Sequence, residues 1–153
     1  MSKDMIQDVK DFAQAAESIN AKTHSRREVN ILCGKLIDEE ASETKTDLDN
    51  YIISGSLEHL LGAVDGALDT IYVCLFFLNQ NFINVQAHWD VVQERNMAKF
   101  PGGKTIKNEY GKVVKPEGWF PPDAQHMELL IEWNSKMRGE FYKGGLIQHE
   151  EGK

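Results

Sequence analysis

Apolar residues recur along the chain at steps of three and four, which is the period of one face of an α-helix. The pattern predicts five helices, at about residues 4–18, 26–46, 57–80, 84–99 and 123–137. Asp4, Ser56 and Asp123 stand at three of the predicted starts and are typical N-cap residues. Ser25 and Glu28 match a capping box, in which each side chain accepts a hydrogen bond from the other residue's backbone N–H.

The segments between these helices are typical of turns. Residues 47–55 form a short connector, and Pro-Gly-Gly at 101–103 ends the fourth helix. Residues 104–115 alternate around Tyr110-Gly111, which predicts a small β-hairpin, and a proline-rich loop follows. We therefore expect an all-α domain at residues 1–138, built as a four- to five-helix bundle with the hairpin and loop at 103–122. The charged, glycine-rich residues 139–153 are expected to form a flexible tail.

Acidic residues interrupt the apolar face of the second predicted helix. That face has apolar residues at positions 29, 33, 36 and 37, and it continues with Glu40 and Glu43, beside Glu39. Ionised carboxylates that face a core are costly unless they are paired or hydrogen-bonded. No basic residue shares this face. The pattern therefore indicates that these glutamates serve a purpose other than packing.

The third predicted helix repeats this feature. Its apolar face is formed by positions 57, 60, 61, 64, 68 and 71, and Asp65 and Asp69 lie one turn apart on it. Acids at helical spacing on one helix are usually solvated surface, but two helices with the same feature favour a shared cation site. Carboxylate oxygens are the ligands that Mg²⁺ prefers, so the expected cofactor is Mg²⁺, with Mn²⁺ as a substitute.

Composition and charge indicate which classes of partner and which cellular compartment to expect. The chain has 153 residues and a formal net charge of −7, and no stripe of Lys and Arg is evident, so we expect no nucleic-acid partner. Cys33 and Cys74 lie in apolar helical runs, typical of small core residues in a reducing compartment. No secretory signal precedes them, and the longest apolar run, residues 71–78, is far shorter than the roughly 20 residues of a membrane span. We expect a cytoplasmic protein with no membrane partner.

Four blocks of sequence, in order, resemble the MazG-like superfamily of all-α nucleoside triphosphate pyrophosphohydrolases. Residues 39–43, EEASE, are similar to its EExxE helix, and residues 65–73 resemble the second acidic motif of its phosphoribosyl-ATP-pyrophosphohydrolase-like branch. Residues 95–99, RNMAK, and 111–123, GKVVKPEGWFPPD, are also similar to that branch, which includes phage-encoded members. The superfamily's second motif is usually ExxD. Here Gly66 replaces the glutamate, and Asp65 precedes Asp69 by four residues.

The resemblance implies hydrolysis of a nucleoside triphosphate to the monophosphate and pyrophosphate by a homodimer or homotetramer. The best guess at the substrate is a purine deoxynucleotide, dGTP or dATP, in nucleotide-pool control. The implied metal ligands are Glu40, Glu43, Asp65 and Asp69, with Glu39 and Glu43 as catalytic residues, Glu39 binding metal or acting as the base that orients water. Asn96 and Lys99 would contact phosphate oxygens, although a surface lysine at a helix end is the simpler interpretation of Lys99. Phe12 and Tyr72 are foremost core residues and also candidates to lie near the base and sugar.

Two alternatives stay open. A phosphoribosyl-ATP pyrophosphohydrolase is disfavoured because that enzyme resembles only the core helices, whereas this chain adds residues 111–123 and a fifth helix. A non-catalytic helical interaction protein is disfavoured because every acidic position of the metal site is present. The sequence leaves open the base, the sugar, the number of metal ions and the phosphorus atom that is attacked.

Overall fold

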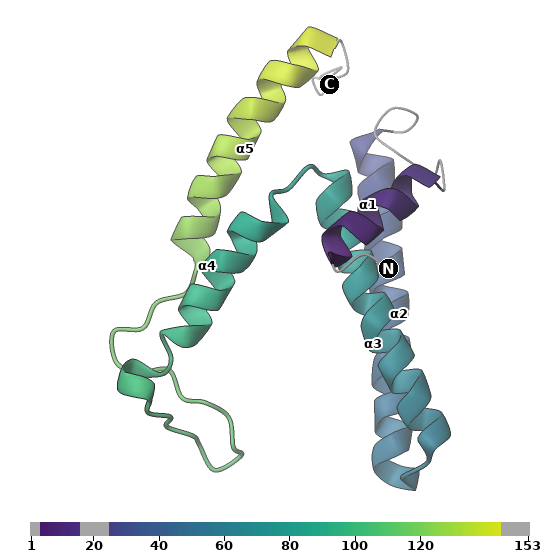
Figure 1. Ribbon diagram of the computed structural model, residues 1–153, viewed down its shortest axis with the longest axis vertical. Helices are drawn as coiled ribbons and strands as arrows, with labels where there is room; N and C mark the ends of the chain where they lie inside the picture. Colours follow the sequence, from purple (N-terminus) through teal and green to yellow (C-terminus); the bar gives the residue numbers. More distant parts are fainter. Residues whose placement is uncertain (1–3, 16–24, 145–153) are drawn as a thin grey trace, which may run out of the picture. The chain divides into compact units, whose positions relative to one another are not determined.

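The computed structural model describes residues 4–15 and 25–144, with side chains as far as Met137. Over these residues the chain is helical without strands, which confirms the all-α class (Figure 1). The elements are α1 (Met5–Ala15), α2 (Arg26–Ser54), α3 (Leu57–Gln80), α4 (Val85–Met97), the 3₁₀ turn η1 (Pro101–Gly103) and α5 (Asp123–Gly144). They fall into two compact units, Met1–Val85 and Gln86–Lys153. The predicted end of the first helix, residues 16–18, lies outside the described residues.

α2 begins where the capping box predicts and ends later than the pattern indicates. Ser25 Oγ accepts from the Glu28 N–H at 3.3 Å, and Glu28 Oε2 accepts from the Ser25 N–H at 2.8 Å. The helix then continues to Ser54, so the predicted connector at 47–55 is wrong. Residues 47–54 contain neither glycine nor proline, and the helix stops at Gly55, whose φ of 65° is the left-handed C-cap that glycine adopts without strain.

α2 and α3 lie side by side as an antiparallel pair joined by Gly55 and Ser56 (Figure 1). Small residues of α3 form the contact: Ala63 is 7% exposed and Gly66 is buried. A Cβ at Gly66 would lie only 2.8 Å from Thr44 Oγ1 and 3.1 Å from Thr44 N. Thus the two backbones approach closely at Gly66 because that residue has no side chain.

The buried core lies where α1 covers one end of this pair. Val9, Val29, Cys33 and Phe76 are its members, none more than 6% exposed, and side chains of α1 and α3 surround them. Cys33 is therefore a core residue, as predicted, and Cys74 is half-buried. Away from α1, the described part of the first unit consists of α2 and α3 alone, and two helices cannot enclose a side chain from all sides.

The bulky apolar face predicted for α3 stays open within the described residues. We call it the α3 stripe, and it consists of Leu57, Leu61, Val64, Leu68 and Ile71, with exposed fractions between 48% and 78%. It is open because α3 turns its small residues towards α2, so its large residues point elsewhere.

By length and composition alone, α3 is also the one described helix that could cross a membrane. Only 17% of its most apolar window is buried within the chain. Asp65 and Asp69 fall within that helix.

In the second unit, turns rather than a hairpin connect α4 to α5. Lys107 and Val113 form one isolated antiparallel bridge, and no strand forms in the part of the chain that the structure describes. The Asn108 side chain accepts from the backbone N–H groups of Tyr110 and Lys112, at 3.1 Å and 2.9 Å. Such a side-chain turn competes with a β-ladder for the same backbone donors, which accounts for the missing strands.

α5 starts at Asp123 itself, so the prediction that Asp123 is the N-cap is wrong by one position. Its carboxylate still lies in the first turn, where negative charge is favourable. The helix continues past its expected end near residue 137 to Gly144, into the segment expected to be a flexible tail. The rest of that segment, 145–153, lies outside the described residues.

Candidate metal centre on α2 and α3

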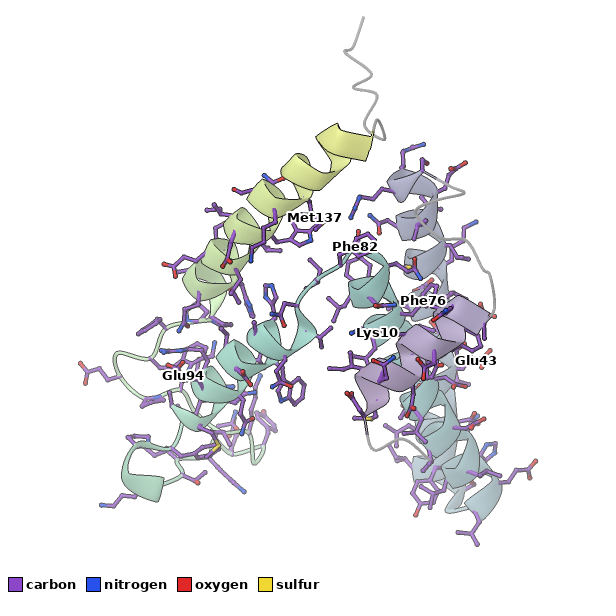
Figure 2. The ribbon with its side chains drawn as sticks, turned by 45° about the horizontal axis from the view of Figure 1, so that its top comes forward. Lys10, Glu43, Phe76, Phe82, Glu94 and Met137 are labelled. Carbon is purple, nitrogen blue, oxygen red and sulfur yellow. The ribbon has the colours of Figure 1, made fainter. Side chains whose placement is uncertain are left out.

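The five acidic residues singled out by the sequence lie on the paired helices α2 and α3. We call Glu39, Glu40, Glu43, Asp65 and Asp69 the acidic centre; Glu43 is labelled in Figure 2. Glu40 is half-buried and the other four are exposed. Desolvation raises the pKa of Glu40, and the negative charges of Asp69, Glu43, Glu39 and Asp65 raise it further. The fold therefore brings carboxylates from two helices close enough to act on one another.

Among the described residues, no ion pair joins a basic side chain to this acidic centre. The pairs Lys45–Asp49, His59–Asp47, Arg95–Glu94 and Lys136–Glu132 all lie outside it. A set of carboxylates without a cation fits a hard divalent ion such as Mg²⁺ in chemistry. As the described side chains lie, no three acidic, histidine or cysteine groups form a set that could hold one ion. Binding would require the exposed carboxylates to rotate towards Glu40.

The structure corrects the expectation that these glutamates face a core. Val29 and Cys33, earlier on the same face, are buried, whereas Glu40 is half-buried and Glu43 is exposed. The core ends near Cys33, because α1 covers only that end of the helix pair. The acidic centre is consequently open to solvent on the described chain, and its exposed carboxylates carry little desolvation cost.

Gly66 explains the departure from the ExxD pattern. It packs against Thr44, whose hydroxyl donates to the Glu40 carbonyl at 2.7 Å and lies 3.1 Å from the hydroxyl of Thr70. A glutamate at position 66 would have its Cβ inside this contact. Asp65, one residue earlier, is exposed and contributes to the raised pKa of Glu40. The carboxylate at position 65 can thus be present without separating the helices.

Phe12 and Tyr72 come together at the α1 end of the pair. Their rings meet edge to face, with centroids 5.6 Å apart and planes at 88°. Tyr72 packs against the core, and burial together with the charge of Asp8 raises the pKa of its hydroxyl. Phe12 is 54% exposed, more than its predicted core role implies. The two rings form an aromatic surface on the first unit.

Asn96 and Lys99 lie in the second unit, at the end of α4 and just beyond it. Lys99 Nζ donates to Asn96 Oδ1 at 2.8 Å, so the structure brings these two residues together. Their predicted contact with phosphate oxygens stays a prediction.

Around Lys99 the structure gathers residues of the blocks 95–99 and 111–123 that the sequence analysis did not group into one site. We call Arg95, Lys99, Lys115, Trp119 and Phe120 the cation–aromatic cluster. Lys115 Nζ lies 4.4 Å and Lys99 Nζ 5.5 Å from the centroid of the Trp119 ring, and the Arg95 guanidinium carbon lies 4.3 Å from that of Phe120. The signal was present in the sequence: residues 95–115 contain one arginine, five lysines and a single acid, Glu109.

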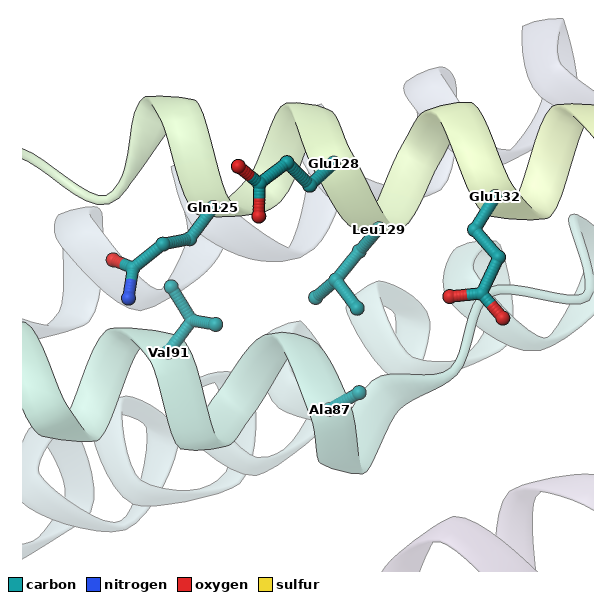
Figure 3. A pocket seen from close by; sticks show the side chains of 6 residues that line it. All are labelled: Ala87, Val91, Gln125, Glu128, Leu129 and Glu132. Atoms are coloured by element: carbon teal, nitrogen blue, oxygen red, sulfur yellow. The ribbon is translucent and has the colours of Figure 1, made fainter.

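The second unit also holds a cavity of about 320 Å³ between α4 and α5 (Figure 3). Ala87, Val91 and Leu129 supply an apolar lining, and Gln125, Glu128 and Glu132 supply oxygen acceptors. No cationic side chain lines it. A triphosphate would meet two carboxylates there, so this cavity is a poor candidate for a nucleotide site.

Comparison with known proteins adds no family assignment: no family model matches the chain, and no curated protein is significantly similar to it. The resemblance to the MazG-like superfamily therefore depends on the four sequence blocks alone.

Proposed function

We propose that this protein is a magnesium-dependent nucleoside triphosphate pyrophosphohydrolase, which converts a nucleoside triphosphate to the monophosphate and pyrophosphate. The observation that carries the proposal is the acidic centre. Desolvation and four neighbouring carboxylates from two helices raise the pKa of Glu40, and none of the five acids has a basic partner in an ion pair of the described residues. Such mutual repulsion is a cost to the fold that a bound cation would remove.

In the proposed site, Glu40, Glu43 and Asp69 hold the ion, with Asp65 as a further ligand. When bound, magnesium supplies charge that offsets the developing negative charge on the phosphate oxygens. Glu39 lies at the edge of the acidic centre and is exposed, so its carboxylate can take a proton from an attacking water or bind metal. We assign the same orienting role to Glu43, which is also exposed.

The remaining predicted residues are assigned to substrate binding. Lys99 contributes a point charge and Asn96 an amide donor for phosphate oxygens. Phe12 and Tyr72 offer an aromatic surface on the same unit as the acidic centre, and such a surface suits stacking against a base. A purine deoxynucleotide, dGTP or dATP, stays the preferred substrate, because the sequence resemblance favours it.

We further propose that a second copy of the chain covers the α3 stripe. Its members follow one another at steps of four, three, four and three residues, the spacing of a helix–helix seam. Fully burying each such side chain contributes about 1.5–3 kcal/mol, so leaving five of them in water is unfavourable. A two-fold axis beside α3 would set each stripe against its own copy, which gives a homodimer or, with a further interface, a homotetramer.

The reaction is tested with a panel of nucleoside triphosphates in magnesium, with pyrophosphate and orthophosphate measured separately. We expect pyrophosphate and a monophosphate, fastest with a purine deoxynucleotide. Release of orthophosphate together with a nucleoside diphosphate would contradict the proposed cleavage to monophosphate and pyrophosphate. Preference for phosphoribosyl-ATP over every nucleoside triphosphate would favour the first alternative enzyme instead.

A second measurement addresses the non-catalytic alternative. A ligand that binds only the native state raises the melting temperature, so magnesium should stabilise the wild-type protein. No stabilisation by magnesium, with or without nucleotide, would favour a helical interaction protein. Binding of the intact chain to lipid vesicles through α3, in place of self-association, would overturn the proposed dimer.

A further inference from the structure

The cation–aromatic cluster has the composition of an anion-binding site. Its three cations lie on the aromatic rings of Trp119 and Phe120, which are adjacent in sequence, and Lys99 and Lys115 share the single ring of Trp119. Among the described residues, neither lysine pairs with a carboxylate. Glu94, which is 59% exposed, is the one acid paired with Arg95. Positive charge is thus concentrated there in a chain whose net charge is −7.

The cluster is held in place by several independent contacts. Trp119 Nε1 donates to the carbonyl of Arg95 at 2.9 Å, which ties the loop to the last turn of α4. The Trp119 N–H donates to the Pro116 carbonyl at 3.1 Å across a tight turn. Gly118 permits that turn with a φ of 76°. The aromatic rings confine the lysine stems, so a ligand would immobilise side chains that are already partly ordered.

The Arg95 side chain contains a buried hydrogen-bond donor without an acceptor. That side chain is only 14% exposed, and its Nε atom is buried without a hydrogen-bond partner. An unsatisfied buried donor costs more than an exposed one, and an oxyanion that reached this atom would remove that cost. Guanidinium groups match the geometry of phosphate oxygens particularly well.

We propose that the cation–aromatic cluster is a binding site for a chain of two or three phosphates, with Arg95, Lys99 and Lys115 as its cations and Trp119 as the platform that holds the two lysines. A compact, multiply charged anion suits three cations on the rings of two consecutive residues. A long polyanion such as a nucleic acid would also meet the acidic remainder of the chain. Binding at this site requires no hydrolysis, but its use for a nucleotide or for product pyrophosphate rests on the proposed function.

The test uses the full chain in chelator, where the acidic centre repels anions and cannot bind them through a metal. Trp89→Phe and Trp133→Phe together leave Trp119 as the only tryptophan, so fluorescence reports this site. Sodium pyrophosphate and tripolyphosphate are titrated at constant ionic strength, with sodium sulfate as the salt control. We expect a saturable change with both phosphate chains and a weak, unsaturated one with sulfate. A nucleoside triphosphate added in a parallel titration shows whether a base strengthens binding.

Lys115→Gln should raise the dissociation constant for pyrophosphate about tenfold or more, the usual worth of a hydrogen bond to a charged group. Lys136→Gln is the matched control, because it removes a lysine of the same unit that pairs with Glu132 instead of a ring. Arg95→Lys keeps the charge and removes the planar group, and it should also weaken binding. Circular dichroism melting verifies that each variant is folded.

Three results would overturn the proposal: no saturable change at millimolar pyrophosphate, equal weakening by Lys115→Gln and Lys136→Gln, or preference for a single-stranded oligonucleotide over pyrophosphate. Because no step requires metal or turnover, these results are separate from a failure to hydrolyse triphosphates. Hydrolysis without pyrophosphate binding in chelator would retain the proposed function and reject this site.

Discussion

The acidic centre and the cation–aromatic cluster accumulate opposite charges in different units of one chain, and they do so by different means. In the acidic centre, two helices carry five carboxylates, and desolvation together with repulsion from the other four raises the pKa of Glu40. In the cation–aromatic cluster, a loop and a helix end place cations on the faces of Trp119 and Phe120. Among the described residues, no ion pair includes a member of the acidic centre, and Arg95, paired with Glu94, is the one cation of the cation–aromatic cluster in an ion pair.

Because the two groups are built differently, each can respond to a ligand in a different way. The carboxylates of the acidic centre share a helical backbone, and taking up protons or a cation relieves their repulsion. The lysines of the cation–aromatic cluster lie on the Trp119 ring, so binding an anion costs them little further side-chain freedom.

The largest expected effect comes from neutralising the acidic centre. Glu40→Gln should lower turnover by more than roughly 100-fold, because it removes a proposed metal ligand. In chelator the variant should melt at the wild-type temperature or above it, since a repelling charge is gone. Asp69→Asn should behave in the same way.

Asp38→Asn provides the control for these substitutions. Asp38 is an exposed acid of α2 that does not contribute to the raised pKa of Glu40, so the variant should keep its turnover. Glu40→Gln protein that melts well below wild type in chelator but still hydrolyses triphosphate would show that the carboxylate is structural.

Placing a charge on the α3 stripe should have the next largest effect. In Leu68→Asp, two copies would each lose the burial of one leucine, which weakens a dimer on the order of 100-fold or more. Light scattering at micromolar concentration should show the mass of one chain, against two or four for wild type. Ile106→Asp changes an equally exposed residue of the loop and should leave the mass unchanged. A wild-type protein that is already monomeric would contradict the proposed interface.

Gly66→Ala tests whether the close approach of α2 and α3 requires a residue without a side chain at position 66. The added Cβ would press on the Thr44 backbone, and overpacking of this kind costs about 1–3 kcal/mol. Gly34→Ala is the matched control on α2, because a Cβ there meets nothing within 4 Å and gains up to about 1 kcal/mol of helix propensity. Denaturant unfolding should show opposite signs for the two variants, and equal stabilisation by both would contradict the close contact.

The smallest effect is a difference in pH response between the two units. Burial and the neighbouring His126 lower the pKa of His88, whose Nδ1 lies 2.8 Å from Nδ1 of His126. Just below the ordinary histidine pKa of about 6.5, the unfolded chain therefore binds more protons than the folded one. The second unit should lose stability as the pH falls through that range.

Glu40 has the opposite effect on the first unit. Its pKa is raised in the folded state, so the folded unit binds more protons than the unfolded chain at pH values above the ordinary glutamate pKa. The first unit should therefore gain stability as the pH falls.

All three tryptophans lie in the second unit, so their fluorescence reports its unfolding, whereas Tyr51 and Tyr72 belong to the first. His126→Gln should flatten the loss of tryptophan-monitored stability between about pH 7 and pH 5.5. An unchanged slope in that variant would contradict the role of the histidine pair.

The sequence by itself determined the features that depend on local physics. The helix starts at Ser25 and Ser56 and the core role of Cys33 follow from capping chemistry and apolar periodicity. The identity of the acidic residues and their position on α2 and α3 were equally accessible, because helical spacing fixes which side chains share a face.

Only the tertiary structure decided which face of each helix is covered. Periodicity identified the bulky face of α3 as core, but Gly66 and Ala63 pack on α2 instead and leave the α3 stripe open. Likewise, the basic residues near position 100 are spread along the sequence, and only folding of the loop places Lys115 and Lys99 on Trp119. A periodic pattern shows which residues lie on one side of a helix, whereas the partner of that side depends on how closely the backbones can approach, and this is a property of the pair.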